Sequence, residues 1–280
     1  MLRISDDAVR SRATDSYWRF LNLTKPDLLR FAANPAGKEH YRLLSHLASQ
    51  IPHGAHVCEF GTHVGTSALA MAASVPLGST ATIHSFDGLD SMIPRPFKRD
   101  RFDHVISDRL KDLRVVTAEG WRKRAEDFVD HEAMRYPALL PQIVFHKVNA
   151  LVSNETLDLC ASPSTFFVFL DTLHFPESKP FEYELLRSLY VERRSKVPLL
   201  LDDIHLNDQM ERLWSSVVAG SRNHTLSGAH GAARPTRASD FLPARTYSTH
   251  DLTRIGHWSG TGLVVFDGGR AVELNGSFRV

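Results

Sequence analysis

Acidic residues follow two of the apolar runs in this sequence. Asp171 follows the run at 165–170, and the adjacent pair Asp202 and Asp203 follows the run at 197–201. If such runs are neighbouring parallel strands, their carboxyl ends lie at one edge of a sheet, where ligands bind. Hard divalent cations prefer oxygen ligands, so we predict Asp171, Asp202 and Asp203 as ligands of a divalent metal, with Mg²⁺ as the expected ion. In the alternative, the same acids orient a cofactor or cap a helix without metal.

Histidines lie close to both acidic positions. His174 comes shortly after Asp171, and His205 comes shortly after Asp203. Imidazole titrates near neutral pH and serves as a general base. We predict His174 and Asp171 as the catalytic residues, with His174 removing a proton from the substrate. His205 is the second candidate base, and its alternative role is to stabilise the loop in which it lies.

A glycine-containing turn joins an apolar run to a helix-forming segment at 57–67. The run ends near Glu59, and Gly61 and Gly65 follow before the helix. Glycine allows close approach of the backbone to a ligand, and the first N–H groups of a helix bind carboxylates or phosphates. Glu59 is suited to accept from a ligand ammonium or to fix the loop. The alternative is a tight turn whose glycines serve geometry alone.

A further acid, Asp87, ends the next apolar run at 81–86. An acid at this position is suited to hydrogen-bond both hydroxyls of a ribose. A nicotinamide site would also place an acid here. However, the fingerprint G-x-G-x-x-G of such sites is not matched by the spacing of Gly61 and Gly65.

Two segments resemble a known enzyme family. The pattern E-x-G-T-x-x-G-T-S at 59–67 resembles motif I of class I S-adenosylmethionine (SAM)-dependent methyltransferases, particularly O-methyltransferases. The segment FDGLDSMIP at 86–94 resembles the corresponding part of macrocin-type O-methyltransferases. The resemblance implies that the following residues bind the cofactor SAM: Glu59, Gly61, Thr62, Gly65, Thr66 and Ser67 around its methionine part, Asp87 at the ribose and Asn149 at the adenine.

The acidic positions also resemble the metal-binding acids of catechol-type and macrocin-type O-methyltransferases. In this family the last residue of the cluster is often Asn, where this chain has Asp203. The segment D-T-L-H at 171–174 departs from the commoner D-G-D-H and lacks one acid. This departure leaves the metal-free alternative open.

Short apolar runs alternate with longer amphipathic segments through most of the chain. Parallel strands need crossover helices, so the alternation predicts an α/β fold with helices on both faces of the sheet. We predict a Rossmann-like, seven-stranded, mostly parallel sheet that ends in an antiparallel C-terminal hairpin. The candidate strands are 55–60, 81–86, 142–148, 165–170, 197–201, 245–253, 261–267 and 271–274, and the expected helices are 38–50, 66–74, 153–160, 178–195 and 207–219.

The expected organisation is an N-terminal helical extension at 1–36 and a methyltransferase domain at 37–280. This domain contains a basic insertion at about 90–140, which is either a set of solvated helices or a substrate lid. The segment 256–262, a histidine among glycines, either closes one side of the substrate pocket or leads into a hairpin.

Composition excludes several classes of protein. Lys plus Arg (33) nearly equals Asp plus Glu (32), so no general electrostatic footprint for nucleic acid exists. Two cysteines, Cys58 and Cys160, cannot build a disulfide framework or a cysteine-rich zinc site. No apolar run is long enough for a secretory signal or a membrane span. We therefore expect a cytoplasmic protein that binds neither nucleic acid nor membrane, and a homodimer is compatible with the sequence.

These observations favour an enzyme that transfers a methyl group from SAM to a hydroxyl oxygen of a small-molecule metabolite. Because unrelated reactions share this scaffold, two alternatives stay open. One is a SAM-binding relative with different chemistry, in the manner of cephalosporin hydroxylase-like proteins. The other is a non-catalytic SAM- or nucleotide-binding module.

Overall fold

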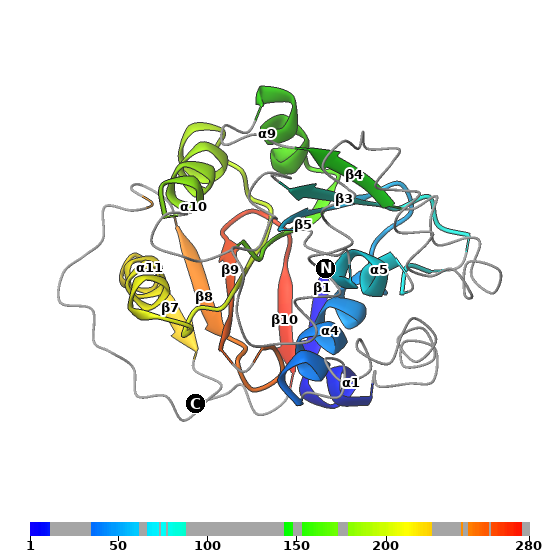
Figure 1. Ribbon diagram of the computed structural model, residues 1–280, viewed down its shortest axis with the longest axis horizontal. Coiled ribbons are helices and arrows are strands. Elements are labelled where there is room, and N and C mark those ends of the chain that lie inside the picture. Colours follow the sequence, from blue (N-terminus) through cyan, green and yellow to red (C-terminus); the bar gives the residue numbers. More distant parts are fainter. Residues whose placement is uncertain are drawn as a thin grey trace, which may run out of the picture.

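A mixed sheet with strand order β4-β3-β2-β5-β6-β9-β8-β7 forms the centre of the protein (Figure 1). The computed structural model describes residues 1–11, 35–61, 66–72, 74–76, 78–87, 143–147, 153–172, 179–225, 242, 246–257 and 259–275. The strands of this sheet are β2 (His56–Phe60), β3 (Thr82–Asp87), β4 (Ile143–Lys147), β5 (Thr165–Leu170), β6 (Leu199–Asp202), β7 (Asn223–Thr225), β8 (Tyr247–Asp251) and β9 (Thr261–Phe266).

Among the described residues, helices lie between β2 and β3, between β4 and β5 and between β5 and β6, as predicted for parallel strands. They are α1 (Asp6–Ser11), α4 (Pro35–Ala48), α5 (Thr66–Ala72), α9 (Asn154–Ala161), α10 (Lys179–Leu186), the π-helical η3 (Arg187–Glu192) and α11 (Asp208–Ala219). The predicted helix at 178–195 is thus α10 continued by η3. Among the described residues, no helix has the length and apolar character that crossing a membrane requires.

Both faces of the sheet are covered by helices. Successive side chains of a strand point to opposite faces, and in β2 the neighbours Val57 and Cys58 belong to different cores. Val57 packs in the core that contains residues of α4 and α5. Cys58 packs in the core that contains residues of α9, α10, η3 and α11. Every residue of β5 is buried, as expected for a strand covered on both faces. The predicted α/β class is confirmed.

The order of the strands reverses next to β2. This strand pairs in parallel with β3 on one side and with β5 on the other, so the chain builds the sheet outward in both directions from β2. In open α/β sheets, ligands bind beyond the carboxyl ends of the strands at such a reversal. At the far side, β9 pairs antiparallel with both β6 and β8, which confirms the predicted antiparallel end.

Two parts of the sequence prediction were wrong about the ends of the chain. Residues 2–5, assigned to a helical extension, form the strand β1 (Leu2–Ser5), and it pairs in parallel with β10 (Val272–Asn275) in a separate two-stranded sheet. The run at 271–274 therefore does not join the main sheet. Residues 2–5 form a strand because Leu2 and Ile4 can be buried on one face while Arg3 is exposed on the other. An alternation over so few residues is too short to recognise in the sequence.

The main sheet also has one strand more than predicted, the edge strand β7, which pairs in parallel with β8. The N-terminal segment packs on the main domain: the Arg3 carbonyl accepts a hydrogen bond from the Gln50 side chain at 2.7 Å. The basic insertion predicted at about 90–140 lies outside the described residues.

Candidate functional site

The carboxyl ends of the parallel strands form one rim of the sheet. Because β9 runs antiparallel to β6, its first residue, Thr261, pairs with the last residue of β6, Asp202. The strand β8 runs antiparallel to β9, so its last residue, Asp251, lies at the same rim. The rim thus collects residues from the ends of β2, β5, β6 and β8 and from the start of β9.

Gly61 and Asp171, the residues that directly follow the neighbouring parallel strands β2 and β5, are in direct backbone contact, and we call this contact the crossing of β2 and β5. Gly61 has φ +100°, and its N–H donates to the Phe86 carbonyl at 2.9 Å. A Cβ at this position would lie 1.6 Å from the carbonyl oxygen of Asp171, so any other residue would clash with the backbone after β5. This close contact with the Asp171 backbone agrees with the alternative in which Gly61 serves the geometry of the turn. An approach to SAM stays a prediction.

Glu59 is fully buried. Its Oε2 accepts from the Ser85 hydroxyl at 2.5 Å, and Ser85 is its register partner in β3. This bond joins the ends of β2 and β3 and agrees with the alternative in which Glu59 fixes the loop. A contact between Glu59 and a ligand stays a prediction.

The other predicted cofactor residues are only partly described. The helix α5 begins at Thr66, as the motif predicts, and Ser67 is buried. Asp87 is the last residue of β3. The positions outside the described residues are Thr62, Gly65 and Asn149, together with the side chains of Thr66 and Asp87.

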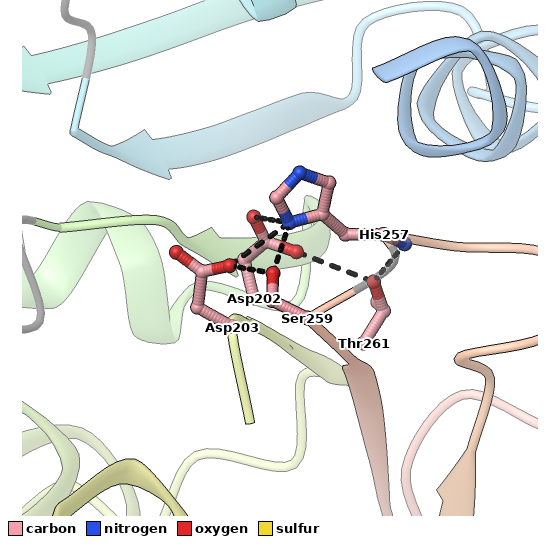
Figure 2. A network of polar contacts seen from close by, with 5 residues as sticks. All are labelled: Asp202, Asp203, His257, Ser259 and Thr261. Atoms are coloured by element: carbon pink, nitrogen blue, oxygen red, sulfur yellow. Dashed lines mark hydrogen bonds and ion pairs between the residues drawn. The ribbon is translucent and has the colours of Figure 1, made fainter. Parts of the chain in front are cut away.

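Asp202, Asp203 and His257 form a compact cluster of metal-ligating side chains (Figure 2). One ligand atom from each lies within 4.8 Å of the others. The His257 Nδ1 lies 2.9 Å from Asp203 Oδ1 and 3.5 Å from Asp202 Oδ2. The side chains are shielded, with exposed fractions of 4% for Asp202, 15% for Asp203 and 20% for His257. The predicted acids Asp202 and Asp203 are therefore brought together.

Two hydroxyls fix the orientation of this cluster. Thr261 Oγ1 donates to Asp202 Oδ1 at 3.2 Å and accepts from the backbone N–H of His257 at 2.9 Å. Ser259 Oγ donates to Asp203 Oδ1 and also contacts the His257 ring. Outer hydrogen bonds of this kind orient the ligands of metal sites.

The local backbone explains how two consecutive acids face one point. Consecutive residues in an extended strand point to opposite sides. Asp203 leaves β6 with φ +58°, a left-handed conformation that Asp tolerates better than most residues. The strand therefore ends at Asp202, and the turn lets the Asp203 carboxylate lie on the same side as that of Asp202.

The arrangement does not support a serine nucleophile. In a Ser-His-Asp triad, the serine and the acid bond to different ring nitrogens. Here Ser259 Oγ and Asp203 Oδ1 both contact Nδ1 of His257. The proton relay of a triad therefore cannot form. The carboxylate oxygens and the imidazole nitrogen that converge here fit a cation better.

Asp171 does not belong to this cluster. Among the described residues, the group of ligand atoms that lie within 4.8 Å of one another is made by Asp202, Asp203 and His257. The Asp171 N–H donates to the Phe60 carbonyl at 2.9 Å, so its backbone belongs to the crossing of β2 and β5. The next residue, Thr172, donates to Glu182 Oε1 of α10 at 2.5 Å, which gives the departure from D-G-D-H a structural role.

His205 is bonded to Asp251 and to the segment before β9. Its Nε2 lies 3.1 Å from Asp251 Oδ2, and its backbone N–H donates to the Ser259 carbonyl at 2.7 Å. Burial raises the pKa of Asp251, but hydrogen bonds from His205 and Thr253 outweigh it and leave this pKa below its ordinary value. These contacts agree with the loop-stabilising alternative for His205. His174 lies outside the described residues, so its role as the base stays a prediction.

The sequence prediction missed His257 as a partner of the acids. His257 and Asp203 are 54 positions apart in the chain, and only the antiparallel entry of β9 brings them together. The available signal was a histidine just before the last long apolar run of the sheet. That segment was predicted to close the pocket or to lead into a hairpin.

Comparison with known proteins found similar solved structures at low sequence identity. No protein-family model and no curated protein matches the sequence. Solved structures similar to this chain include the O-methyltransferase TomG from Streptomyces achromogenes in complex with SAM, with 15% identity over 91% of each chain and a TM-score of 0.44. A second is an O-methyltransferase from Bacillus cereus in complex with S-adenosylhomocysteine, with 12% identity over 93% of this chain and 91% of that chain and a TM-score of 0.42.

Proposed function

We propose that this protein is a SAM-dependent methyltransferase that transfers a methyl group to a hydroxyl oxygen of a small molecule, with a divalent cation at the acidic cluster. The observation that carries the proposal is the position of the motif at 59–67. Its strand ends where the strand order reverses, and its first glycine, Gly61, contacts the loop after β5. This is where α/β sheets bind nucleotide-containing ligands.

The cofactor side of the proposal rests on the residues around this reversal. Glu59 and Ser85 tie the ends of β2 and β3, and Gly61 holds the loops after β2 and β5 together. The first residues after the two strands are thereby fixed relative to each other. When bound, SAM supplies a methyl group on a positively charged sulfur. The chain would serve to align donor and acceptor at this rim, and such alignment accounts for much of the rate in group transfer.

The acceptor side of the proposal rests on Asp202, Asp203 and His257. The donor set of two carboxylates and an imidazole fits a divalent cation. A cation held there lowers the pKa of a bound hydroxyl. Thr261 and Ser259 keep the ligands in place. We propose His174 as the residue that removes the acceptor proton and Asp171 as its neighbour at the end of β5.

Calorimetry on the full chain tests the cofactor. We expect SAM and S-adenosylhomocysteine to bind and NAD to bind at least tenfold more weakly. A preference for NAD would contradict the methyltransferase proposal. Binding of SAM without transfer of isotope-labelled methyl to any hydroxyl compound in a phenol and sugar panel would favour a non-catalytic module or different chemistry.

A further inference from the structure

The cluster at the end of β6 contains a nitrogen ligand, which a magnesium site does not need. Mg²⁺ is a hard ion that keeps several waters and binds through carboxylates. Imidazole suits Zn²⁺, Fe²⁺, Co²⁺ and related ions better. We infer that Asp202, Asp203 and His257 form a site for a transition-metal dication of this class rather than for Mg²⁺.

The distances within the cluster match those between neighbouring ligands of one such ion. Metal–ligand bonds of ~2.1 Å at angles between square and tetrahedral separate two ligand atoms by about 3.0–3.4 Å. The His257 Nδ1 lies 2.9 Å from Asp203 Oδ1 and 3.5 Å from Asp202 Oδ2. The three side chains can therefore meet one ion with small shifts.

The hydrogen bonds of His257 indicate how the ion would be accommodated. A carboxylate only accepts hydrogen bonds, so the contact from Nδ1 to Asp203 requires a proton on Nδ1 when Asp203 is ionised. A cation can bind Nδ1 only after this proton has left that nitrogen, either by a shift of neutral His257 to the Nε2–H tautomer or by loss of the Nδ1 proton of an imidazolium to solvent. The same atom that now bonds Asp203 thus becomes the nitrogen ligand.

The surrounding hydroxyls support a fixed site rather than a chance meeting of surface groups. Ser259 and Thr261 are nearly fully buried, and each binds one of the acids. Thr261 also holds the backbone of His257. These bonds restrain the acids and the imidazole before any ion binds, which reduces the entropy lost on binding.

The experiment titrates the metal-free full chain with Co²⁺, Zn²⁺ and Mg²⁺, using calorimetry and the visible absorption of Co²⁺. We expect Co²⁺ and Zn²⁺ to bind one site at least tenfold more tightly than Mg²⁺, and the Co²⁺ spectrum to differ from that of the hydrated ion. His257→Gln and His257→Ala should each weaken Co²⁺ binding at least tenfold and leave Mg²⁺ binding nearly unchanged. Asp203→Asn should weaken the binding of all three ions.

A matched control addresses the other histidines of the chain. His84 Nδ1 and His146 Nε2 lie 2.9 Å apart on β3 and β4, so they offer a second pair of imidazole ligands away from the cluster. His146→Ala should leave tight Co²⁺ binding intact. Loss of that binding in His146→Ala and its retention in both His257 variants would overturn the inference, as would equal affinities for Mg²⁺ and Co²⁺. Thermal melts of the metal-free variants identify any that fail to fold, and His257→Gln remains the test if His257→Ala does.

The inference concerns the ion at the site of the proposed function, but its measurement does not depend on methyl transfer. Selective Co²⁺ binding without SAM binding would leave the metal inference standing and contradict the proposed function. SAM binding with a preference for Mg²⁺ would contradict the metal inference and leave the proposed function standing. The two failures are therefore distinguishable.

Discussion

The rim of the sheet contains two regions that are built in different ways, the crossing of β2 and β5 and the junction of β6 and β9. At the crossing, the decisive contacts are made by backbone atoms: Gly61 faces the Asp171 carbonyl, and strand ends are tied by peptide hydrogen bonds. At the junction, they are made by side chains that converge from Asp202, Asp203 and His257.

This difference determines how each region tolerates change. A backbone crossing depends on the absence of a side chain and on a left-handed conformation, so nearly every substitution at Gly61 is harmful. A side-chain cluster depends on the chemical type of its members. Conservative substitutions there should change ligand binding while leaving the fold intact.

The largest expected effect is the loss of the catalytic base. It decides whether the base lies after β5, at His174, or at the junction of β6 and β9, at His205. If His174 removes the acceptor proton, His174→Ala should lower turnover by about 10²–10⁴-fold with little change in SAM affinity. His205→Ala is the matched control, because His205 is bound to Asp251 and should affect stability more than turnover. Turnover and SAM affinity are measured for both variants. A larger loss of turnover in His205→Ala would move the base to the junction.

The next effect is on the stability of the crossing. Gly61→Ala places a methyl group 1.6 Å from the Asp171 carbonyl at φ +100° and should lower the free energy of unfolding by about 3 kcal/mol. Gly78→Ala is the control, because Gly78 also has a positive φ (+76°) but has nothing within 4 Å of the added Cβ. It should cost about 1 kcal/mol. Denaturant unfolding of both variants measures the difference, and equal losses would mean that the backbone contact is unimportant.

A smaller effect is expected from the hydroxyls of the junction. Thr261→Val keeps the shape of the side chain but removes its bonds to Asp202 and to the His257 backbone. Loss of such a supporting bond typically weakens metal affinity by about 10–100-fold. Co²⁺ titration measures this loss, with Thr80→Val in an exposed loop as the control. An unchanged affinity would show that Thr261 does not orient the ligands.

The last effect is a pH dependence of stability at the edge of the sheet formed by β3 and β4, where His84 lies. Burial, with His146 and His56 nearby, lowers the pKa of His84 from 6.5 to about 4. The unfolded chain therefore binds more protons between these values, and stability should fall as the pH drops from 6.5 towards 4, by at most ~1.4 kcal/mol per pH unit for one proton. In His84→Gln this slope should be shallower.

The junction should respond at lower pH. The pKa of Asp251 lies below 3.8, so the stability contributed by its bonds to His205 and Thr253 is present above 3.8 and is lost as the pH falls through the folded value. Denaturant unfolding at pH 7, 5.5 and 4.5 measures the loss of stability that is expected from His84 between pH 6.5 and 4. A slope there that is unaffected by His84→Gln would show that His84 does not cause it.

Much of the fold is readable from local pattern. The predicted strands at 55–60, 81–86 and 165–170 agree closely with β2, β3 and β5, because apolar runs bounded by turn residues are a local signal. The same holds for the motif from Glu59 to Thr66, where β2 ends at Phe60 and α5 begins at Thr66. The pairing of β1 with β10 lacked such a signal, since it joins the two ends of the chain.

The sequence by itself determined the α/β class, the end of β2, the start of α5 and the acids at the ends of β5 and β6, because each depends on residues that are neighbours in the chain. Only the tertiary structure decided which side chains share a site. Asp171 has its backbone at the crossing with Gly61, whereas Asp202 and Asp203 meet His257. The physical reason is that β9 enters the sheet antiparallel to β6. Its first residues therefore lie beside the carboxyl ends of strands that come much earlier in the sequence.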